Sequence, residues 1–261
     1  MTADAYRPRR LAQTRFLPLR GLDYHLTQWG PWGQSGEPRS DQPLLVMVHG
    51  FMDVGASFQF VLDAMQSERT IVAPDWRGFG LTRSPRGTDA YWFQDYVGDL
   101  DALIDALSPD APVDLVGHSM GGNVAMTYAG VRPTRIRRLV NLEGFGLPDL
   151  RPEQAPGRLA QWLDELKAPK DLKDYASLDE VALRMCRNNP RLPADKARWL
   201  AGHWAEPAAS GRWELRADPA QYDLIVMDLT DPGAPDDAGG HANALYHPES
   251  YAPIRSDRKS T

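Results

Sequence analysis

Cysteine is almost absent from this sequence of 261 residues, in which Cys186 stands alone. One thiol cannot form an internal disulfide, and it cannot supply a cysteine-based zinc cluster. Long apolar runs are absent too, because the longest, near residues 44–48 and 224–227, fall far short of the roughly 18 residues of a membrane span. No apolar stretch of signal-peptide length follows the first residues. We therefore expect a soluble, cytoplasmic protein that has no membrane partner.

An excess of positive charge is also missing. The chain carries 29 Lys and Arg against 35 Asp and Glu, so its net charge is −6. A mildly acidic chain lacks the basic surface of a nucleic-acid-binding protein, and we expect no nucleic-acid partner. Hydrophobic residues make up 42%, which is ordinary for a globular protein of this length, and such a chain needs no metal or disulfide to hold its core.

Apolar segments of two kinds alternate along the first half of the chain. Short continuous apolar runs, typical of strands buried on both faces of a parallel sheet, occupy residues 44–48, 70–73, 113–116 and 138–142. Helical spacing of apolar residues predicts helices over residues 57–66, 91–107 and 120–131. Two short strands are also expected around Gly21, within residues 15–29. Strict alternation of strand and helix predicts an α/β fold with a doubly wound, mostly parallel sheet.

The pattern changes near residue 148. Residues 150–216 give no strand signal, hold four of the eight tryptophans and predict short helices, which we interpret as a helical cap inserted on the sheet. Strand composition returns at residues 222–227. The predicted organisation is a core over residues 15–148, a cap over 149–217 and an atypical C-terminal segment over 218–261.

Residues 117–121 read Gly-His-Ser-Met-Gly and lie directly after one predicted strand and directly before a helix. This is the G-x-S-x-G nucleophile elbow in the strand–turn–helix context that it requires. The two glycines permit a tight turn that exposes Ser119 at its apex, with the N-terminus of the helix behind it. The alternative is that Ser119 only caps the helix.

A serine hydrolase also needs two N–H donors directed at the developing oxyanion. Met120, which follows the nucleophile, supplies one, and Phe51, in the loop after the strand at 44–48, supplies the other by position. We expect the His49 side chain to be hydrogen-bonded within that turn. Gly50, His118 and, from the cap, Trp162 are the predicted substrate contacts.

Four motifs together resemble the α/β-hydrolase family over about residues 15–219: His-Gly-Phe-Met-Asp at 49–53, Asp-Trp-Arg-Gly-Phe-Gly at 75–80, the elbow, and Leu-Glu-Gly-Phe-Gly at 142–146. They look most like the capped branch that includes esterases, epoxide hydrolases and dehalogenases. The last two use an aspartate nucleophile, and Ser119 argues against both. Asp75 and Arg77 are expected to organise their turn rather than to react.

The resemblance implies the chain order serine, acid, histidine. His241, in a Gly-His pair that resembles the terminal loop of the family, is the candidate base, and His247 is the second choice. Three carboxylates compete for the acid: Glu143 after the fourth predicted strand, and Asp228 or Asp231 after the strand at 222–227. Alternatively, both histidines are exposed loop residues.

The end of the chain does not fit this pattern. Asp228 and His241 are 13 positions apart, whereas a helix, a strand and two loops need roughly 20 residues, so the last strand and helix are expected to be missing or replaced. Residues 222–255 resemble spermidine synthases, in which aspartates at positions 228 and 231 would handle an amine. No glycine-rich nucleotide-binding unit precedes them, which excludes a complete aminopropyltransferase.

Two explanations of the tail remain: a fusion or frame error that joins two genes near residues 218–222, or a divergent hydrolase with a shortened C-terminus. Either leaves a sheet edge uncovered, which predicts low stability and possible self-association through that edge.

The predicted function is a serine hydrolase that cleaves a carboxylic ester or a related acyl bond through an acyl-enzyme. Its partner is a small-molecule acyl substrate, and the mechanism needs no cofactor and no metal. The alternatives are a catalytically impaired remnant with an aminopropyltransferase-like tail, and a binding protein that uses the cap cleft without chemistry.

Overall fold

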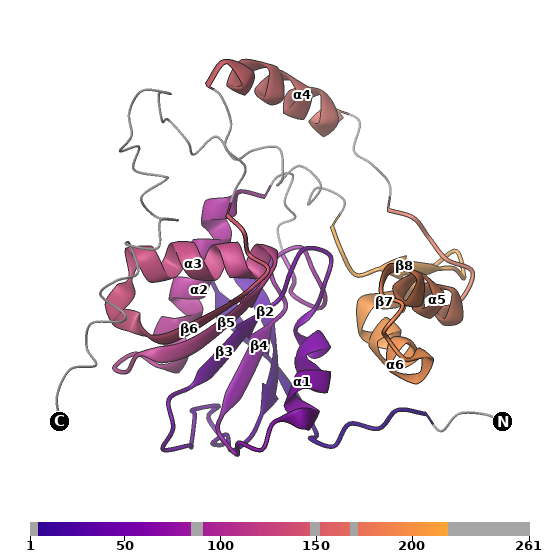
Figure 1. The fold of residues 1–261 in the computed structure, drawn as a ribbon. Coiled ribbons are helices and arrows are strands. Elements are labelled where there is room, and N and C mark those ends of the chain that lie inside the picture. The colour runs from indigo at the N-terminus through magenta and orange to yellow at the C-terminus, as the bar shows by residue number, and fades with distance from the viewer. Residues whose placement is uncertain (1–4, 85–90, 147–151, 168–171, 219–261) are drawn as a thin grey trace.

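A computed structural model describes residues 5–84, 91–146, 152–167 and 172–218. Figure 1 shows the elements of this part of the chain. Its strands are β1 (Gln13–Leu19), β2 (Leu22–Trp29), β3 (Leu45–Val48), β4 (Ile71–Pro74), β5 (Val113–His118), β6 (Ile136–Leu142), β7 (Ala205–Pro207) and β8 (Trp213–Leu215). Its α-helices are α1 (Gln59–Ala64), α2 (Phe93–Leu107), α3 (Met120–Val131), α4 (Ala155–Lys167), α5 (Leu178–Asn188) and α6 (Ala194–Trp204). Short 3₁₀ turns are η1 (Gly55–Phe58), η2 (Pro133–Arg135) and η3 (Pro152–Gln154).

The predicted α/β sheet is confirmed. Within the described residues its strand order is β1-β2-β4-β3-β5-β6, in which β3 pairs in parallel with β4 and β5, and β5 with β6. The hairpin of β1 and β2 joins antiparallel to β4. Because β3 lies next to β5 and parallel to it, the carboxyl ends of these two strands lie side by side. These are the ends that carry the predicted oxyanion loop and the elbow.

Strand β3 shows why the apolar runs are continuous. Val46 and Val48 belong to the core cluster that includes residues of α2 and α3, such as Leu100 and Val124. Leu45 and Met47 point the other way, into a cluster with Leu62 of α1. Because alternate side chains of a strand face opposite sides of the sheet, a strand covered on both sides must be apolar at every position.

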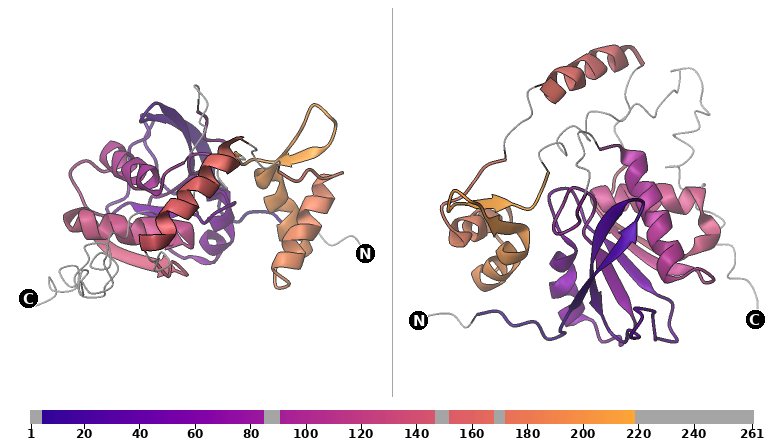
Figure 2. Two further views of the ribbon diagram at one scale, coloured as in Figure 1. Left: turned by 90° about the horizontal axis from the view of Figure 1, so that it is seen from above. Right: turned by 180° about the vertical axis from the view of Figure 1, so that it is seen from behind.

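Residues 172–217 form a second unit, here called the α5–α6 unit. Helices α5 and α6 pack on each other and share a core of Val181, Ala197 and Leu200 with the hairpin of β7 and β8. Figure 2 shows this unit beside the sheet and α4 above the core. The expectation that residues 150–216 hold no strand was wrong, because β7 and β8 lie there. Strands of three residues are too short to give a period of two.

At the far edge of the described sheet, β6 leaves Val140 and Leu142 about half exposed. The expected self-association through an uncovered edge stays a prediction, because residues 219–261 lie outside the described part. Among the described residues, no helix combines the length and apolar character that a membrane crossing requires.

Candidate active site

Ser119 lies between the end of β5 and the first residue of α3, in a backbone conformation that side chains rarely adopt. Its φ is 51° and its ψ is −118°. Such a conformation costs about 1–3 kcal/mol and persists only where its surroundings enforce it. Here the Ser119 N–H donates to the Leu142 carbonyl at 2.8 Å, and the Ser119 carbonyl accepts from the Asn123 N–H at 3.1 Å. The turn is therefore held from β6 on one side and from α3 on the other.

The two glycines of the elbow are required by close backbone approach. A Cβ at Gly117 would lie 2.4 Å from the Gly121 carbonyl oxygen, and a Cβ at Gly121 would lie 2.4 Å from that of Val48. Both neighbours are backbone atoms, which cannot swing away as a flexible side chain can. The absence of side chains at these positions lets α3 start directly against β3 and β5.

The predicted oxyanion loop follows β3 and lies against the serine. A Cβ on Gly50 would be 3.1 Å from the Ser119 Cβ and 3.2 Å from Nδ1 of His118. Met120 is the first residue of α3, where helical N–H groups have no partner within their own helix. The structure thus brings Gly50 against Ser119, with Phe51 next along the loop and Met120 at the start of α3. Whether Phe51 and Met120 hold an oxyanion stays a proposal.

His49 anchors this loop from behind. It is fully buried, its Nε2 accepts the Trp76 N–H at 2.9 Å, and its Nδ1 is 2.7 Å from the Gly50 carbonyl oxygen. An Nε2 that accepts leaves Nδ1 as the donor, and burial lowers the pKa of His49, so the ring is neutral. Because a trans peptide is planar, holding the Gly50 carbonyl also directs the Phe51 N–H away from the ring.

Glu143 follows β6 at the same edge of the sheet as Ser119. Its φ is 61°, its side chain is 74% exposed, and one carboxylate oxygen lies 3.9 Å from Nε2 of His118. Asn141 fixes the turn, because its Oδ1 accepts the Gly144 N–H at 2.8 Å and its Nδ2 donates to the Gly144 carbonyl. The carboxylate is thus placed beside the elbow and open to a further partner.

Asp75 and Arg77 have the supporting roles that the sequence predicted. The Asp75 carboxylate accepts from the backbone N–H groups of Gly55 and Leu81 and lies 2.8 Å from Nδ1 of His25. Burial alone would raise the pKa of Asp75, but the His25 hydrogen bond, the nearby histidines and the Leu81 N–H lower it overall. Arg77 pairs with the buried carboxylate of Asp99 on α2.

The remaining predicted site residues divide into two groups. Trp162, on α4, packs against Trp92 at the start of α2 with ring centroids 5.8 Å apart, and its contact with substrate stays a prediction. Outside the described residues lie His241 and His247, the candidate bases, with Asp228 and Asp231, the alternative acids. Within the described ranges, no three His, Cys, Asp or Glu side chains converge as a metal site would need.

The pattern that defines the alpha/beta hydrolase fold family matches residues 43–226, well over half of the chain. The chain belongs to the α/β-hydrolase family. It is therefore an enzyme of the hydrolase kind, whose members act on esters and related substrates. The match covers β3, the elbow, β6 and the α5–α6 unit.

Two relatives illustrate this membership. A 2-hydroxy-6-oxo-2,4-heptadienoate hydrolase of Pseudomonas putida is 34% identical over 225 residues, which cover 78% of each chain. The thioesterase domain from the curacin biosynthetic pathway has a TM-score of 0.71 at 26% identity, over 86% of this chain and 76% of that one. An esterase from Mycobacterium tuberculosis, at 18% identity and a TM-score of 0.57 over 81% and 67% of the two chains, shows the shared fold.

The family match also runs through residues 222–226 of this α/β-hydrolase, which belong to the segment that resembles spermidine synthases. That second resemblance receives no support, and the proposed junction near residues 218–222 stays a prediction that lies largely outside the described residues.

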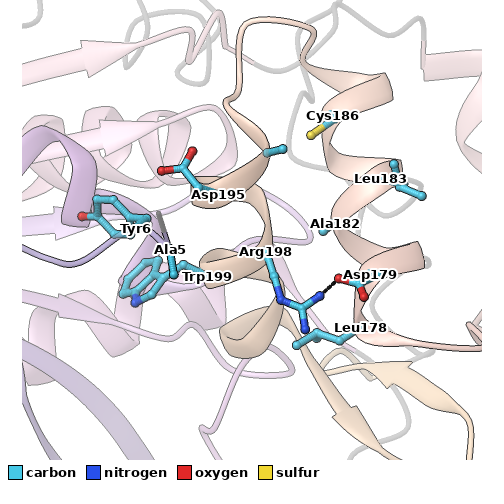
Figure 3. A pocket seen from close by; sticks show the side chains of 11 residues that line it. Ala5, Tyr6, Leu178, Asp179, Ala182, Leu183, Cys186, Asp195, Arg198 and Trp199 are labelled. Atoms are coloured by element: carbon cyan, nitrogen blue, oxygen red, sulfur yellow. Dashed lines mark ion pairs between the residues drawn. The ribbon is translucent and has the colours of Figure 1, made fainter. Parts of the chain in front are cut away.

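A wide groove of this α/β-hydrolase lies on the α5–α6 unit and includes none of the predicted catalytic residues. It has a volume of about 710 Å³, and Figure 3 shows Tyr6 and Trp199 at one side, with Cys186 and the ion pair of Asp179 and Arg198 across from them. Tyr6 comes from the N-terminal segment, where its hydroxyl donates to Asp63 of α1. The segment thus spans α1 and α6.

Sequence reasoning missed the contact that joins the α5–α6 unit to the predicted oxyanion loop. Nε1 of Trp204, at the end of α6, donates to Oδ1 of Asp53 at 3.0 Å, and the same oxygen accepts the Val54 N–H and the Ser57 hydroxyl. Trp204 and Asp53 are 151 positions apart, so no local sequence pattern predicts their hydrogen bond.

Proposed function

We propose that this α/β-hydrolase is a serine esterase that cleaves a carboxylic ester or a related acyl bond through an acyl-enzyme. The observation that carries the proposal is the strained backbone of Ser119, at φ 51°, with the Gly50 loop and the start of α3 on either side. A polar side chain held at this cost beside a helix N-terminus is typical of an activated nucleophile.

In the proposed reaction, Ser119 Oγ attacks the carbonyl carbon while His241 takes its proton, with His247 as the second choice. The N–H groups of Phe51 and Met120 stabilise the oxyanion of the tetrahedral intermediate. The intermediate expels the alcohol, which receives the proton from the histidine, and leaves an acyl group on Ser119. Water, deprotonated by the same histidine, then releases the acid and regenerates the serine.

Glu143 is the proposed acid, which would accept the N–H of the imidazole and stabilise the imidazolium. Three observations support it: its place at the sheet edge next to the elbow, the turn fixed by Asn141, and the 74% exposure that leaves its carboxylate open to a partner. Asp228 is the alternative. By their printed names, the P. putida relative is a hydrolase of 2-hydroxy-6-oxo-2,4-heptadienoate and the curacin domain is a thioesterase.

We propose that α4 and the α5–α6 unit together form the cap over the active site. We infer that Trp162 and the tryptophans of that unit favour an apolar acyl or alcohol group. Support comes from the position of α4 above the core (Figure 1) and from the partial exposure of Leu159 and Leu163 on the same helix.

Hydrolysis of 4-nitrophenyl butyrate tests the proposal. We expect turnover by the unchanged chain and a loss of at least about a thousandfold in Ser119→Ala, because no other group replaces the nucleophile. Ser210→Ala, at an exposed serine in the loop between β7 and β8, is the matched control and should keep full activity. His241→Ala should lose as much as Ser119→Ala. Equal turnover in Ser119→Ala and the parent chain would contradict the proposal.

A further inference from the structure

The predicted oxyanion loop, residues 49–54, runs from the core of the sheet into the core of the α5–α6 unit. Phe51 packs against the apolar cluster that includes residues of β3 and α3, whereas Val54 is buried in the cluster that includes residues of α5 and α6. Met52, which lies between them, packs against both clusters. The loop that lies against the elbow at Gly50 is therefore part of the α5–α6 core four residues later.

Met52 has a positive φ of 55° at this crossing. Residues other than glycine rarely adopt such a conformation, and it persists only where the surroundings enforce it. The core anchors the loop at its two ends, through the buried ring of His49 and through the Gly55 N–H, which donates to the Asp75 carboxylate at 2.7 Å. These anchors lie outside residues 51–53, whose conformation therefore depends on further contacts.

One of these contacts comes from the end of α6. Nε1 of Trp204 donates to Oδ1 of Asp53 at 3.0 Å, and the same oxygen accepts the Val54 N–H at 2.8 Å and the Ser57 hydroxyl. Hydrogen bonds to a carboxylate are stronger than those between neutral groups. The rigid indole ring therefore fixes the Asp53 side chain, and with it the loop two residues after Phe51.

A second contact comes from the segment that follows β8. The Arg216 N–H donates to the Trp204 carbonyl at 2.7 Å, which ties this segment to the end of α6. The Arg216 carbonyl accepts the Gly80 N–H, and the Asp218 N–H donates to the Gly78 carbonyl, both at 2.8 Å. The chain that leaves the α5–α6 unit is thus paired with the loop after β4.

Phe79 connects this pairing to the predicted oxyanion loop. Its backbone forms an antiparallel bridge with Ala217, and its side chain is only 2% exposed. Its ring meets the Phe51 ring edge-on, with centroids 5.5 Å apart and an interplanar angle of 84°. Phe51 is therefore held by a buried side chain whose own backbone is paired with the α5–α6 unit.

We propose that the α5–α6 unit positions the oxyanion donor, because its packing on the core holds the Phe51 N–H in line through Trp204 on one side and Phe79 on the other. Both are positioning residues, which act through Asp53 and Phe51. The inference rests on the proposed esterase function and deepens it, since displacement of the unit would switch the site off. An oxyanion donor acts mainly on the transition state, so displacement slows the chemical step more than it weakens substrate binding.

The test measures kcat and KM separately with 4-nitrophenyl butyrate. We expect Trp204→Phe, which removes the N–H donor but keeps an aromatic ring, to lower kcat about 10- to 100-fold while KM stays within about threefold. Asp53→Asn should lower kcat in the same way, and the double variant should lose little more, because both changes weaken one hydrogen bond. Asp174→Asn, which breaks the ion pair with Arg212 in the same unit, is the matched control and should keep full kcat.

The second contact is tested by Phe79→Leu, which keeps an apolar side chain but removes the ring edge that meets Phe51. It should also lower kcat at a nearly constant KM. For any of these variants, a loss of kcat/KM that arises from KM alone would mean that the unit only binds substrate, and would overturn the inference. An unchanged kcat in Trp204→Phe would overturn it as well.

Hydrogen–deuterium exchange follows the loop without turnover. The Val54 and Gly55 N–H groups are hydrogen-bonded in the parent chain, so Trp204→Phe should speed exchange in a peptide over residues 50–56 by about tenfold, whereas Asp174→Asn should not. Unchanged exchange in Trp204→Phe would overturn the inference. If no ester is hydrolysed but exchange in the loop still depends on Trp204, the positioning of the loop by the α5–α6 unit holds and the proposed esterase function fails.

Discussion

At the scale of single residues, the assignment of Glu143 as the acid of the proposed triad can be tested directly. Glu143→Gln keeps the size of the side chain but removes the charge that would orient and stabilise the imidazolium. We predict a fall in kcat of about 10³–10⁴-fold, measured with 4-nitrophenyl butyrate. Asp228→Asn should stay within about tenfold of the parent chain. The reverse ranking would transfer the acid role to Asp228.

His49 makes a second prediction at this scale, in the pH dependence of stability. Burial lowers its pKa below the ordinary 6.5, so at mildly acidic pH the unfolded chain binds a proton that the folded chain does not. The free energy of unfolding should therefore decline as pH falls below 6.5, until the folded pKa is reached. Urea titrations between pH 7.5 and about pH 5 measure the slope.

His49→Gln is the control for that slope, since glutamine does not titrate. Burial also lowers the pKa of His203, which still contributes to the pH dependence of the free energy of unfolding in this variant. The slope should therefore become smaller but not reach zero. An equally steep decline in His49→Gln would show that the buried ring is not its source.

At the scale of elements, the contact between the start of α3 and the end of β3 decides whether the elbow forms. Gly121→Ala would place a Cβ 2.4 Å from the Val48 carbonyl and 2.5 Å from that of His49. Because neither backbone atom can yield cheaply, we predict a loss of about 2–4 kcal/mol in the free energy of unfolding. Gly202→Ala in α6, which has open space around it, should stabilise the chain by about 0.5–1 kcal/mol. Equal effects of the two changes would contradict the packing described.

At the scale of the whole molecule, the α5–α6 unit is joined to the proposed oxyanion loop through Trp204 and Asp53. A double-mutant cycle of Trp204→Phe and Asp53→Ala should give a coupling of about 1.5–3 kcal/mol in the free energy of unfolding, as expected for one hydrogen bond to a charged group. Pairing Trp204→Phe with Asp174→Ala, whose partner is Arg212, should be additive. Additivity in both cycles would mean that the unit and the loop are energetically independent.

Features of the fold and site that depend on local interactions could be predicted from the sequence, whereas features that depend on contacts between distant segments could not. The run at residues 44–48 and the Gly-His-Ser-Met-Gly turn are local patterns, and they located β3, β5, α3 and Ser119 correctly. Strands β7 and β8 were not predicted, because a strand of three residues shows no periodicity in its sequence. The two strands are held by pairing with each other. The Trp204–Asp53 hydrogen bond and the contact of Arg184 with the Tyr175 ring depend on how separate segments pack together in the fold. A short stretch of sequence does not hold that information.

The central claim is that Ser119 is an activated nucleophile, and labelling with a fluorophosphonate probe tests it most directly, since the probe reacts with such serines and needs no knowledge of the substrate. We predict stoichiometric labelling of the full chain and none of Ser119→Ala, with Ser210→Ala labelled as fully as the parent. A folded parent chain that stays unlabelled, or a Ser119→Ala chain that labels equally, would contradict the claim.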